Sequence, residues 1–93
     1  MNEVYSKNPD VIFRKIADEF ILVPIRQRAV DLRCVYTLNE TAAFIWQAFD
    51  GKKSVSQIKD NLAEAFEVES SRAESDISQI VSQWEAMSLI QRA

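Results

Sequence analysis

The sequence predicts a single α+β domain in which three short strands are followed by three helices. Two observations support this prediction. Apolar residues alternate with polar ones, or gather in short β-branched runs, as far as Leu38, and from Asn39 onward they recur at helical spacing. Strands and helices are therefore segregated along the chain, which is typical of α+β rather than alternating α/β domains. Because 93 residues have room for one hydrophobic core, we expect residues 1–93 to form one domain.

Three strands are predicted, at 11–16, 20–25 and 32–38. The first follows a turn signal at residues 8–10 and is rich in β-branched and aromatic residues. The second ends near Pro24, which fits the end or the edge of a strand, and a short polar break separates it from the first. These two segments therefore predict a hairpin. The third alternates strictly, with one face formed by Leu32, Cys34, Tyr36 and Leu38.

Three helices are predicted after Leu38. Asn39 is expected to cap the first, and capping-box patterns that begin at Ser54 and Ser71 predict the starts of the other two. The third helix has a long apolar stripe that we expect to lie in the core. The stripe consists of Ala73, Ile77, Ile80, Val81, Trp84 and Met87. The predicted helices span 40–50, 55–67 and 71–88.

The composition excludes most catalytic and metal chemistry. The chain has no histidine and a single cysteine, Cys34, so a Cys/His zinc site, a Ser-His or Cys-His dyad and an internal disulfide cannot be assembled. Its single glycine, Gly51, is too few for either glycine-rich phosphate-binding motif. We therefore expect a protein that is not an enzyme and that holds no metal and no cofactor.

The sequence shows no signal for membrane insertion or secretion. No apolar run approaches the roughly 20 residues that span a bilayer. Residues 1–5 lack the basic start and apolar stretch of a secretory signal. We expect a cytoplasmic protein that does not contact membranes.

Three motifs, taken in their order and spacing, make the chain similar to a known family. They are Asn8-Pro9 with Phe13-Arg14, Leu38-Asn39-Glu40-Thr41-Ala42 leading to Ile45-Trp46, and Phe49-Asp50-Gly51-Lys52-Lys53-Ser54-Val55 leading to Ile58. Over residues 8–90 the chain resembles the PqqD-like family, which comprises the pyrroloquinoline quinone (PQQ) synthesis protein D and its relatives. These proteins are also described as precursor-peptide recognition elements of ribosomally synthesised, modified peptides.

The resemblance implies a winged-helix-like fold and a non-catalytic, peptide-binding adaptor. Such an adaptor binds the leader of a precursor peptide and presents it to a modifying enzyme, often a radical S-adenosylmethionine enzyme, in PQQ synthesis or a related peptide pathway. In the family, the leader adds as a strand beside the third strand and lies against the third helix. The corresponding residues here are Arg33, Cys34, Val35, Tyr36 and Thr37 on the strand, and Arg72, Asp76, Gln79 and Gln83 on the helix.

Each of these features also has a structural explanation. Every sheet has edges, so the third strand alone does not indicate a site. Cys34 alternates inward with Tyr36 and is expected to be a small buried residue. The polar residues from Arg72 to Gln83 form one stripe beside the apolar one, and such a stripe is also typical of a solvated face. The basic residues Arg26, Arg28 and Arg33 fit either an acidic partner or a solvated hairpin tip.

Two other functions stay open at this point: a winged-helix DNA-binding regulator, and a structural module that forms a homodimer through its sheet edge. Charge opposes the first, because residues 39–93 contain five basic and nine acidic side chains. The third helix offers Arg72 against Glu74, Asp76 and Glu85, whereas a helix that faces phosphates is expected to be basic. We expect no nucleic-acid binding.

Overall fold

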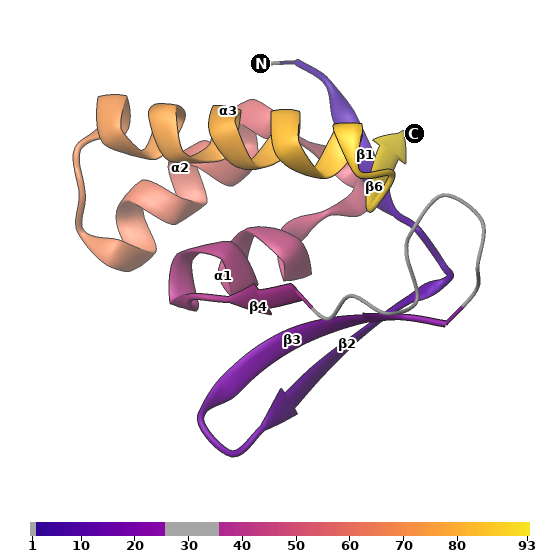
Figure 1. Cartoon of the computed structure of the whole chain (residues 1–93). Helices are drawn as coiled ribbons and strands as arrows, with labels where there is room; N and C mark the ends of the chain where they lie inside the picture. The colour runs from indigo at the N-terminus through magenta and orange to yellow at the C-terminus, as the bar shows by residue number, and fades with distance from the viewer. Residues whose placement is uncertain (1, 26–35) are drawn as a thin grey trace.

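The computed structural model of the chain describes residues 2–25 and 36–93 (Figure 1). It contains three helices and two three-stranded antiparallel sheets, one of which, β2–β3–β4, corresponds to the predicted sheet. The α+β prediction is therefore confirmed, whereas the winged-helix description stays a prediction. In chain order the elements are β1 (Val4–Lys7), β2 (Val11–Ile16), β3 (Glu19–Pro24), β4 (Tyr36–Leu38), α1 (Glu40–Ala48), β5 (Asp50–Ser54), α2 (Val55–Phe66), α3 (Ser70–Ala86) and β6 (Ile90–Arg92).

The β2–β3–β4 sheet is built on the predicted hairpin. The register of β2 against β3 extends from Val11 opposite Pro24 to Ile16 opposite Glu19. The hairpin turn is formed by residues 17–18, and a second turn, at 8–10, precedes β2, where the backbone N–H of Asp10 donates to Asn8 Oδ1 at 2.9 Å. β4 then pairs with β3 in antiparallel register. Residues 32–35 of the third predicted strand lie outside the described residues.

The second sheet, β5–β1–β6, was not predicted. β1 is its central strand and pairs with β5 on one side and with β6 on the other. Backbone hydrogen bonds extend this pairing from Val55 N to Glu3 O at 2.8 Å and from Ala93 N to Val4 O at 2.9 Å. The sheet thus joins both ends of the described chain to the segment between α1 and α2.

β5 begins with a turn stabilised by the carboxylate of Asp50. The backbone N–H groups of Lys52 and Lys53 each donate to Asp50 Oδ1 at 2.9 Å. These hydrogen bonds, that from Lys53 first, lower the pKa of the Asp50 carboxyl below its ordinary value. Gly51 has a φ of 77°, a left-handed conformation that glycine adopts without strain.

The helices begin where the capping residues predict, with one exception. Asn39 caps α1 by accepting a hydrogen bond from Ala42 N at 2.8 Å, and Ser54 and Gln57 form the capping box of α2. The capping box predicted at Ser71 is wrong. α3 begins at Ser70, and its N-cap, Glu69, makes no side-chain hydrogen bond to the helix. None of the helices among the described residues is long and apolar enough to cross a membrane.

The core lies between the helices and the two sheets, and aromatic side chains connect its parts. Tyr5 of β1 packs against Phe49 with ring centroids 5.9 Å apart, and Phe49 packs against Trp84 of α3 at 6.0 Å. Trp84 in turn meets Trp46 of α1 edge to face at 5.4 Å. The apolar stripe of α3 is buried at Ala73, Ile77 and Trp84 and half-buried at Ile80, Val81 and Met87.

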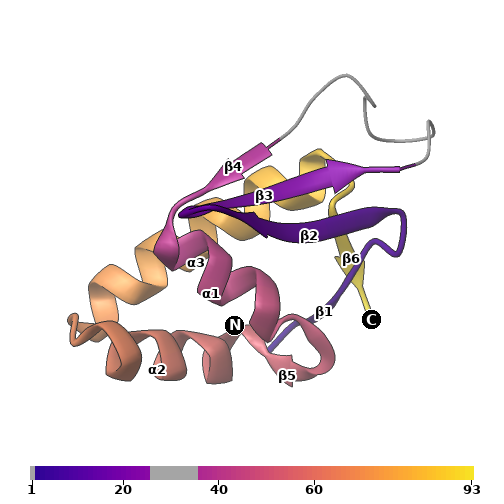
Figure 2. The same ribbon diagram turned by 90° about the horizontal axis from the view of Figure 1, so that it is seen from below.

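The three helices lie on one side of the β2–β3–β4 sheet (Figures 1 and 2). α1 lies against the sheet, and α3 lies beyond it, where it also reaches the strands of the second sheet. This arrangement places the beginning of α3 near the junction between β4 and α1.

Candidate functional site

The first part of the candidate site is β4, which forms an edge of the β2–β3–β4 sheet. Its residues pair with β3 from Phe20 opposite Leu38 to Leu22 opposite Tyr36. No described strand pairs with its other side. An edge strand presents backbone N–H and C=O groups to which another extended chain can pair. β4 can therefore accept an additional strand.

The second part is a hollow of about 270 Å³ that begins where β4 ends. β4 leads through the N-cap residue Asn39 directly into α1, and the beginning of α3 lies opposite this junction. The hollow thus lies between one strand end and one helix. It is lined by Asn39, Thr41, Arg72, Asp76, Gln79 and Ile80.

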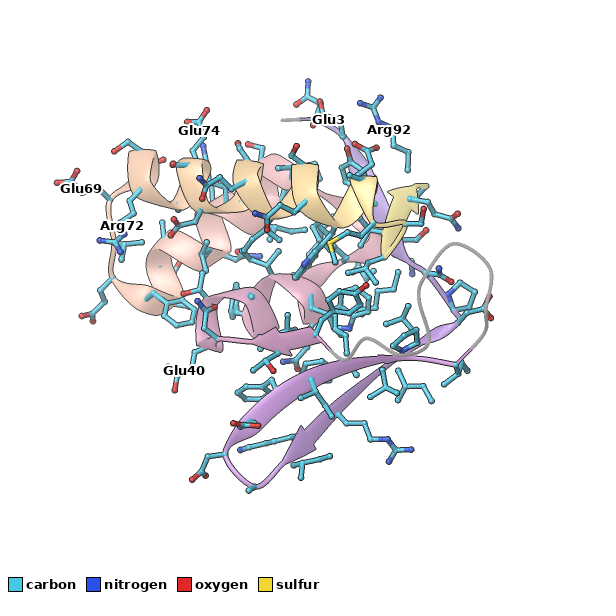
Figure 3. All side chains as sticks on the ribbon, viewed as in Figure 1. Glu3, Glu40, Glu69, Arg72, Glu74 and Arg92 are labelled. Atoms are coloured by element: carbon cyan, nitrogen blue, oxygen red, sulfur yellow. The ribbon has the colours of Figure 1, made fainter. Side chains whose placement is uncertain are left out.

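The wall that α3 contributes contains one cation and one carboxylate. Arg72 Nε lies 4.0 Å from Asp76 Oδ2, one helical turn away. The two side chains are 75% and 38% exposed, so their ion pair contributes little to stability and leaves both groups able to form hydrogen bonds with a ligand. Figure 3 shows Arg72 and Glu74 pointing away from α3 in different directions.

The structure brings three of the four helix residues predicted for the site into this hollow: Arg72, Asp76 and Gln79. Gln83, the fourth, is exposed and does not line it. On the strand, Tyr36 is half-buried and packs against the core, while Thr37 is exposed. The hollow therefore adjoins the described part of the predicted strand.

Several residues predicted for the site lie outside the described residues. They are Arg33, Cys34 and Val35 of the predicted strand, and Arg26 and Arg28 of the basic cluster. Their roles, and the buried position expected for Cys34, stay predictions.

Sequence reasoning missed Asn39, Thr41 and Ile80 as lining residues. It assigned Asn39 to helix capping and Ile80 to the core, and the structure shows that each also borders the hollow. The strand-to-helix transition at Asn39 was visible in the sequence. Its position opposite α3 was not, because that depends on how the helices pack.

Two further hollows differ from the candidate site in their lining. One of about 360 Å³ lies beside β2 and is lined by Lys7, Val11, Phe13, Trp46 and Gln47. The other, of about 410 Å³, is lined by Glu3, Val55, Glu74, Ser78, Val81, Ser82 and Glu85.

Within residues 2–25 and 36–93, no group of His, Cys, Asp and Glu side chains could hold a metal ion.

Comparisons with known proteins agree with the fold. A family model described as Coenzyme PQQ synthesis protein D (PqqD) matches residues 19–90. A lasso peptide synthetase B1 complexed with the leader peptide has a TM-score of 0.76 and 23% identity, and the match covers 94% of this chain and 96% of that chain. TbiB1 in complex with the TbiA(beta) leader peptide has a TM-score of 0.75 and 17% identity, over 92% of this chain and 94% of that chain. At these identities the two structures show a shared fold. No curated protein matches significantly.

Proposed function

This chain belongs to the PqqD family, and we propose that it is a peptide-binding adaptor that binds the leader of a ribosomally synthesised precursor peptide. One observation of the structure supports this function above all. The edge strand β4 and the hollow lined by α3 adjoin each other, so that an extended peptide could pair with the first and place a side chain in the second. The two solved structures described above are complexes with leader peptides.

In this proposal the leader pairs with the strand that contains Arg33–Thr37 and lies along α3 from Arg72 to Gln83. About four to six backbone hydrogen bonds would form, each with a net contribution of about 0.5–1.5 kcal/mol. Association costs at least about 4 kcal/mol, so pairing alone is too weak for micromolar binding. Side chains of the leader must therefore contribute as well.

The lining of the hollow indicates which side chains these are. Five of its six residues are polar or charged, and Ile80 is the one apolar residue. We expect a polar or charged leader residue to bind near Arg72 and Asp76, where charge-assisted hydrogen bonds are available. Apolar leader residues would contribute about 1.5–3 kcal/mol each on full burial, against half-buried surface such as Tyr36.

The adaptor acts without catalysis and presents the bound leader to a separate modifying enzyme. A radical S-adenosylmethionine enzyme is the first candidate, in PQQ synthesis or in a related peptide pathway. The genes that neighbour this one distinguish these pathways. A short precursor gene beside such an enzyme would support the proposal, and quinone-synthesis neighbours would identify the pathway.

The proposal is tested by titrating the purified protein with the synthetic leader of a precursor encoded beside its gene. Asp76→Arg places a cation in the hollow next to Arg72 and should weaken leader binding about tenfold, which corresponds to about 1.4 kcal/mol. Glu74→Arg is the matched control, because it makes the same change of charge on the same helix but outside the hollow.

Calorimetry gives the affinities, and chemical-shift mapping gives the site. Equal weakening by Asp76→Arg and Glu74→Arg would point to overall charge rather than to the hollow. Shifts confined to α2 and to the C-terminal half of α1, with Tyr36 and Thr37 unchanged, would show that the leader binds elsewhere.

We also propose that the protein does not bind nucleic acid. α3 presents Arg72 together with Glu74, Asp76 and Glu85, which gives a surface unsuited to phosphates. A salt-dependent mobility shift of duplex DNA at submicromolar protein would contradict this proposal and favour the winged-helix regulator.

A further inference from the structure

The β2–β3–β4 sheet has a second face, which is turned away from the helices. Val11, Leu22 and Pro24 are buried on the helix side, and side chains along a strand alternate between the two faces. The intervening residues therefore form the opposite face, which we call the outer face. Its residues are Ile12, Arg14, Ile16, Glu19, Ile21, Val23 and Thr37.

Four of the seven outer-face residues are apolar, although no described helix covers this face (Figure 2). Among the described residues, the exposed large hydrophobic side chains are Ile16, at 58%, and Ile25, at 48%. Ile16 belongs to the outer face. Ile25 continues the alternation of β3, and its N–H donates to Asp10 O at 2.8 Å, which extends the hairpin register. Exposed isoleucines on an uncovered sheet face make that face a candidate interaction site.

Two charged residues, Arg14 and Glu19, accompany these side chains on the outer face. Neither forms an ion pair with another described residue. Arg14 lies opposite Ile21 across the hairpin, and Ile16 lies opposite Glu19. The four residues therefore form the corners of a quadrilateral, with the two charges on one diagonal and the two isoleucines on the other.

This arrangement is complementary to itself. A two-fold axis along the Ile16–Ile21 diagonal exchanges the positions of Arg14 and Glu19. Two copies that pack their outer faces together about this axis would place each arginine opposite the glutamate of the other copy, with the isoleucines at the centre. Symmetric dimers require such an isologous surface, whereas a different partner protein does not.

We propose that the outer face binds a second copy of this chain. The dimer uses the outer face, whereas the proposed leader pairs along the edge of β4 away from β3 and reaches the hollow beside α3, so Thr37 is the residue that both surfaces include. The dimer proposal does not rest on leader binding, and each can fail without the other.

The size of the outer face sets the strength of the association. A six-residue strand is about 20 Å long, and three strands about 4.8 Å apart are about 14 Å wide. The face is thus smaller than the roughly 800 Å² per partner of a standard stable interface. We expect a weak dimer that forms at about 10–1,000 μM and dissociates on dilution by mass action.

Sedimentation equilibrium of the full chain tests the proposal. The wild-type protein should have the monomer mass of 10.7 kDa at about 5 μM and shift toward twice that mass at about 1 mM. Arg14→Glu alone and Glu19→Arg alone should each stay monomeric, because each brings like charges together twice. An equimolar mixture of the two variants should associate again, because both ion pairs are restored in the heterodimer.

Controls keep the result interpretable. Lys52→Glu makes the same kind of charge reversal on exposed β5 and should leave association unchanged. Ile16→Ser should weaken association without changing charge, and circular dichroism should show that every variant is folded. Three outcomes would overturn the proposal: a wild-type monomer at all concentrations, association that both charge reversals leave intact, or a mixture of the two variants that stays monomeric. The first would also be the result if a different protein covers the outer face.

Discussion

The two sheets of this protein have three strands each, but they are assembled in different ways. β2, β3 and β4 are neighbours in the sequence as well as in the sheet, and β2 and β3 are joined by a tight turn. β5, β1 and β6 come from the middle, the beginning and the end of the described chain. The difference teaches that the first sheet is a local unit, whose edge and outer face are the surfaces proposed for binding, while the second holds distant segments of the fold together.

The aromatic side chains that pack on the two sheets are also buried to different extents. Tyr5 of β1 is buried against Phe49, which is itself buried against Trp84. In the hairpin, Phe13 and Phe20 stack with centroids 5.8 Å apart, but both rings are only half-buried. We therefore expect the free energy of unfolding to depend more on the second sheet than on the hairpin.

The largest effect should come from replacing one aromatic residue that packs on each sheet: Phe49, which contacts Tyr5 of β1, and Phe13 of β2. Phe49→Ala removes a buried ring between Tyr5 and Trp84 and should lower the free energy of unfolding by about 3–5 kcal/mol. Phe13→Ala should cost about 1–2 kcal/mol, because its ring is half-buried. Urea unfolding measures both values. Equal losses would show that the hairpin is as central to the fold as the second sheet.

A smaller pair of effects should come from the left-handed residue of each sheet. Gly51→Ala should cost about 1–2 kcal/mol, because a φ of 77° is strained for alanine although its Cβ would have room, 3.8 Å from Ser6 Cβ. Ala17→Gly should instead stabilise the hairpin by up to about 1 kcal/mol. Ala17 has a φ of 55° at the first position of a two-residue turn, where glycine is favoured. Thermal unfolding shows whether each variant is less or more stable than the wild type. A Gly51→Ala variant that is more stable would contradict the left-handed conformation assigned to Gly51.

The smallest effect should be a pH-dependent one at β5. Hydrogen bonds from Lys53 N–H and Lys52 N–H lower the pKa of the Asp50 carboxyl in the folded protein. Ionised Asp50 therefore stabilises the fold above its unfolded pKa of about 3.9, and this contribution is lost as pH falls through the lower folded pKa. Wild type should exceed Asp50→Asn in stability at pH 7, and the gap should narrow in acid, as the pH falls below the unfolded pKa and through the lower folded pKa. A gap that is the same at both pH values would mean that the ionised carboxylate is not the cause.

The hairpin and the helices could be predicted because their signals are local. β-Branched and aromatic residues at 11–16 and 20–25 predicted β2 and β3, and side-chain caps at Asn39 and Ser54 predicted two helix starts. α3 shows the limit of this reasoning, because its pattern at Ser71 suggested a cap that the helix does not use. A capping motif indicates where a helix can begin, and neighbouring residues can extend it.

The second sheet could not be predicted because its strands lack a local signal. β5 has the sequence DGKKS, whose composition is typical of a turn, and β6 is three residues long. Their pairing with β1 is decided by residues far away in the sequence. The burial of Tyr5 is visible only when these strands meet.

The candidate site was predicted in part. The polar spacing of Arg72, Asp76 and Gln79 placed them on one face of a helix, and the structure puts all three in the hollow. The contribution of Asn39 and Thr41 was missed, because the position of the β4–α1 junction opposite α3 is a property of tertiary packing. The sequence signal that could have indicated Asn39 and Thr41 is a predicted strand that leads without a loop into a capped helix.

The central position of β1 has a consequence for the synthesis of the chain. Asn8 Nδ2 donates to Ser88 O at 2.9 Å, and these two residues are 80 positions apart. At about 5–20 residues per second, a ribosome adds the second about 4–16 s after the first. During that interval the β2–β3 hairpin can already form, while β1 has no β6 to pair with. The first strand can pair with β5 once residue 54 has emerged, but the edge of β1 that faces β6 is the part that a chaperone or a protease would meet unpaired on the nascent chain until β6 has left the ribosome.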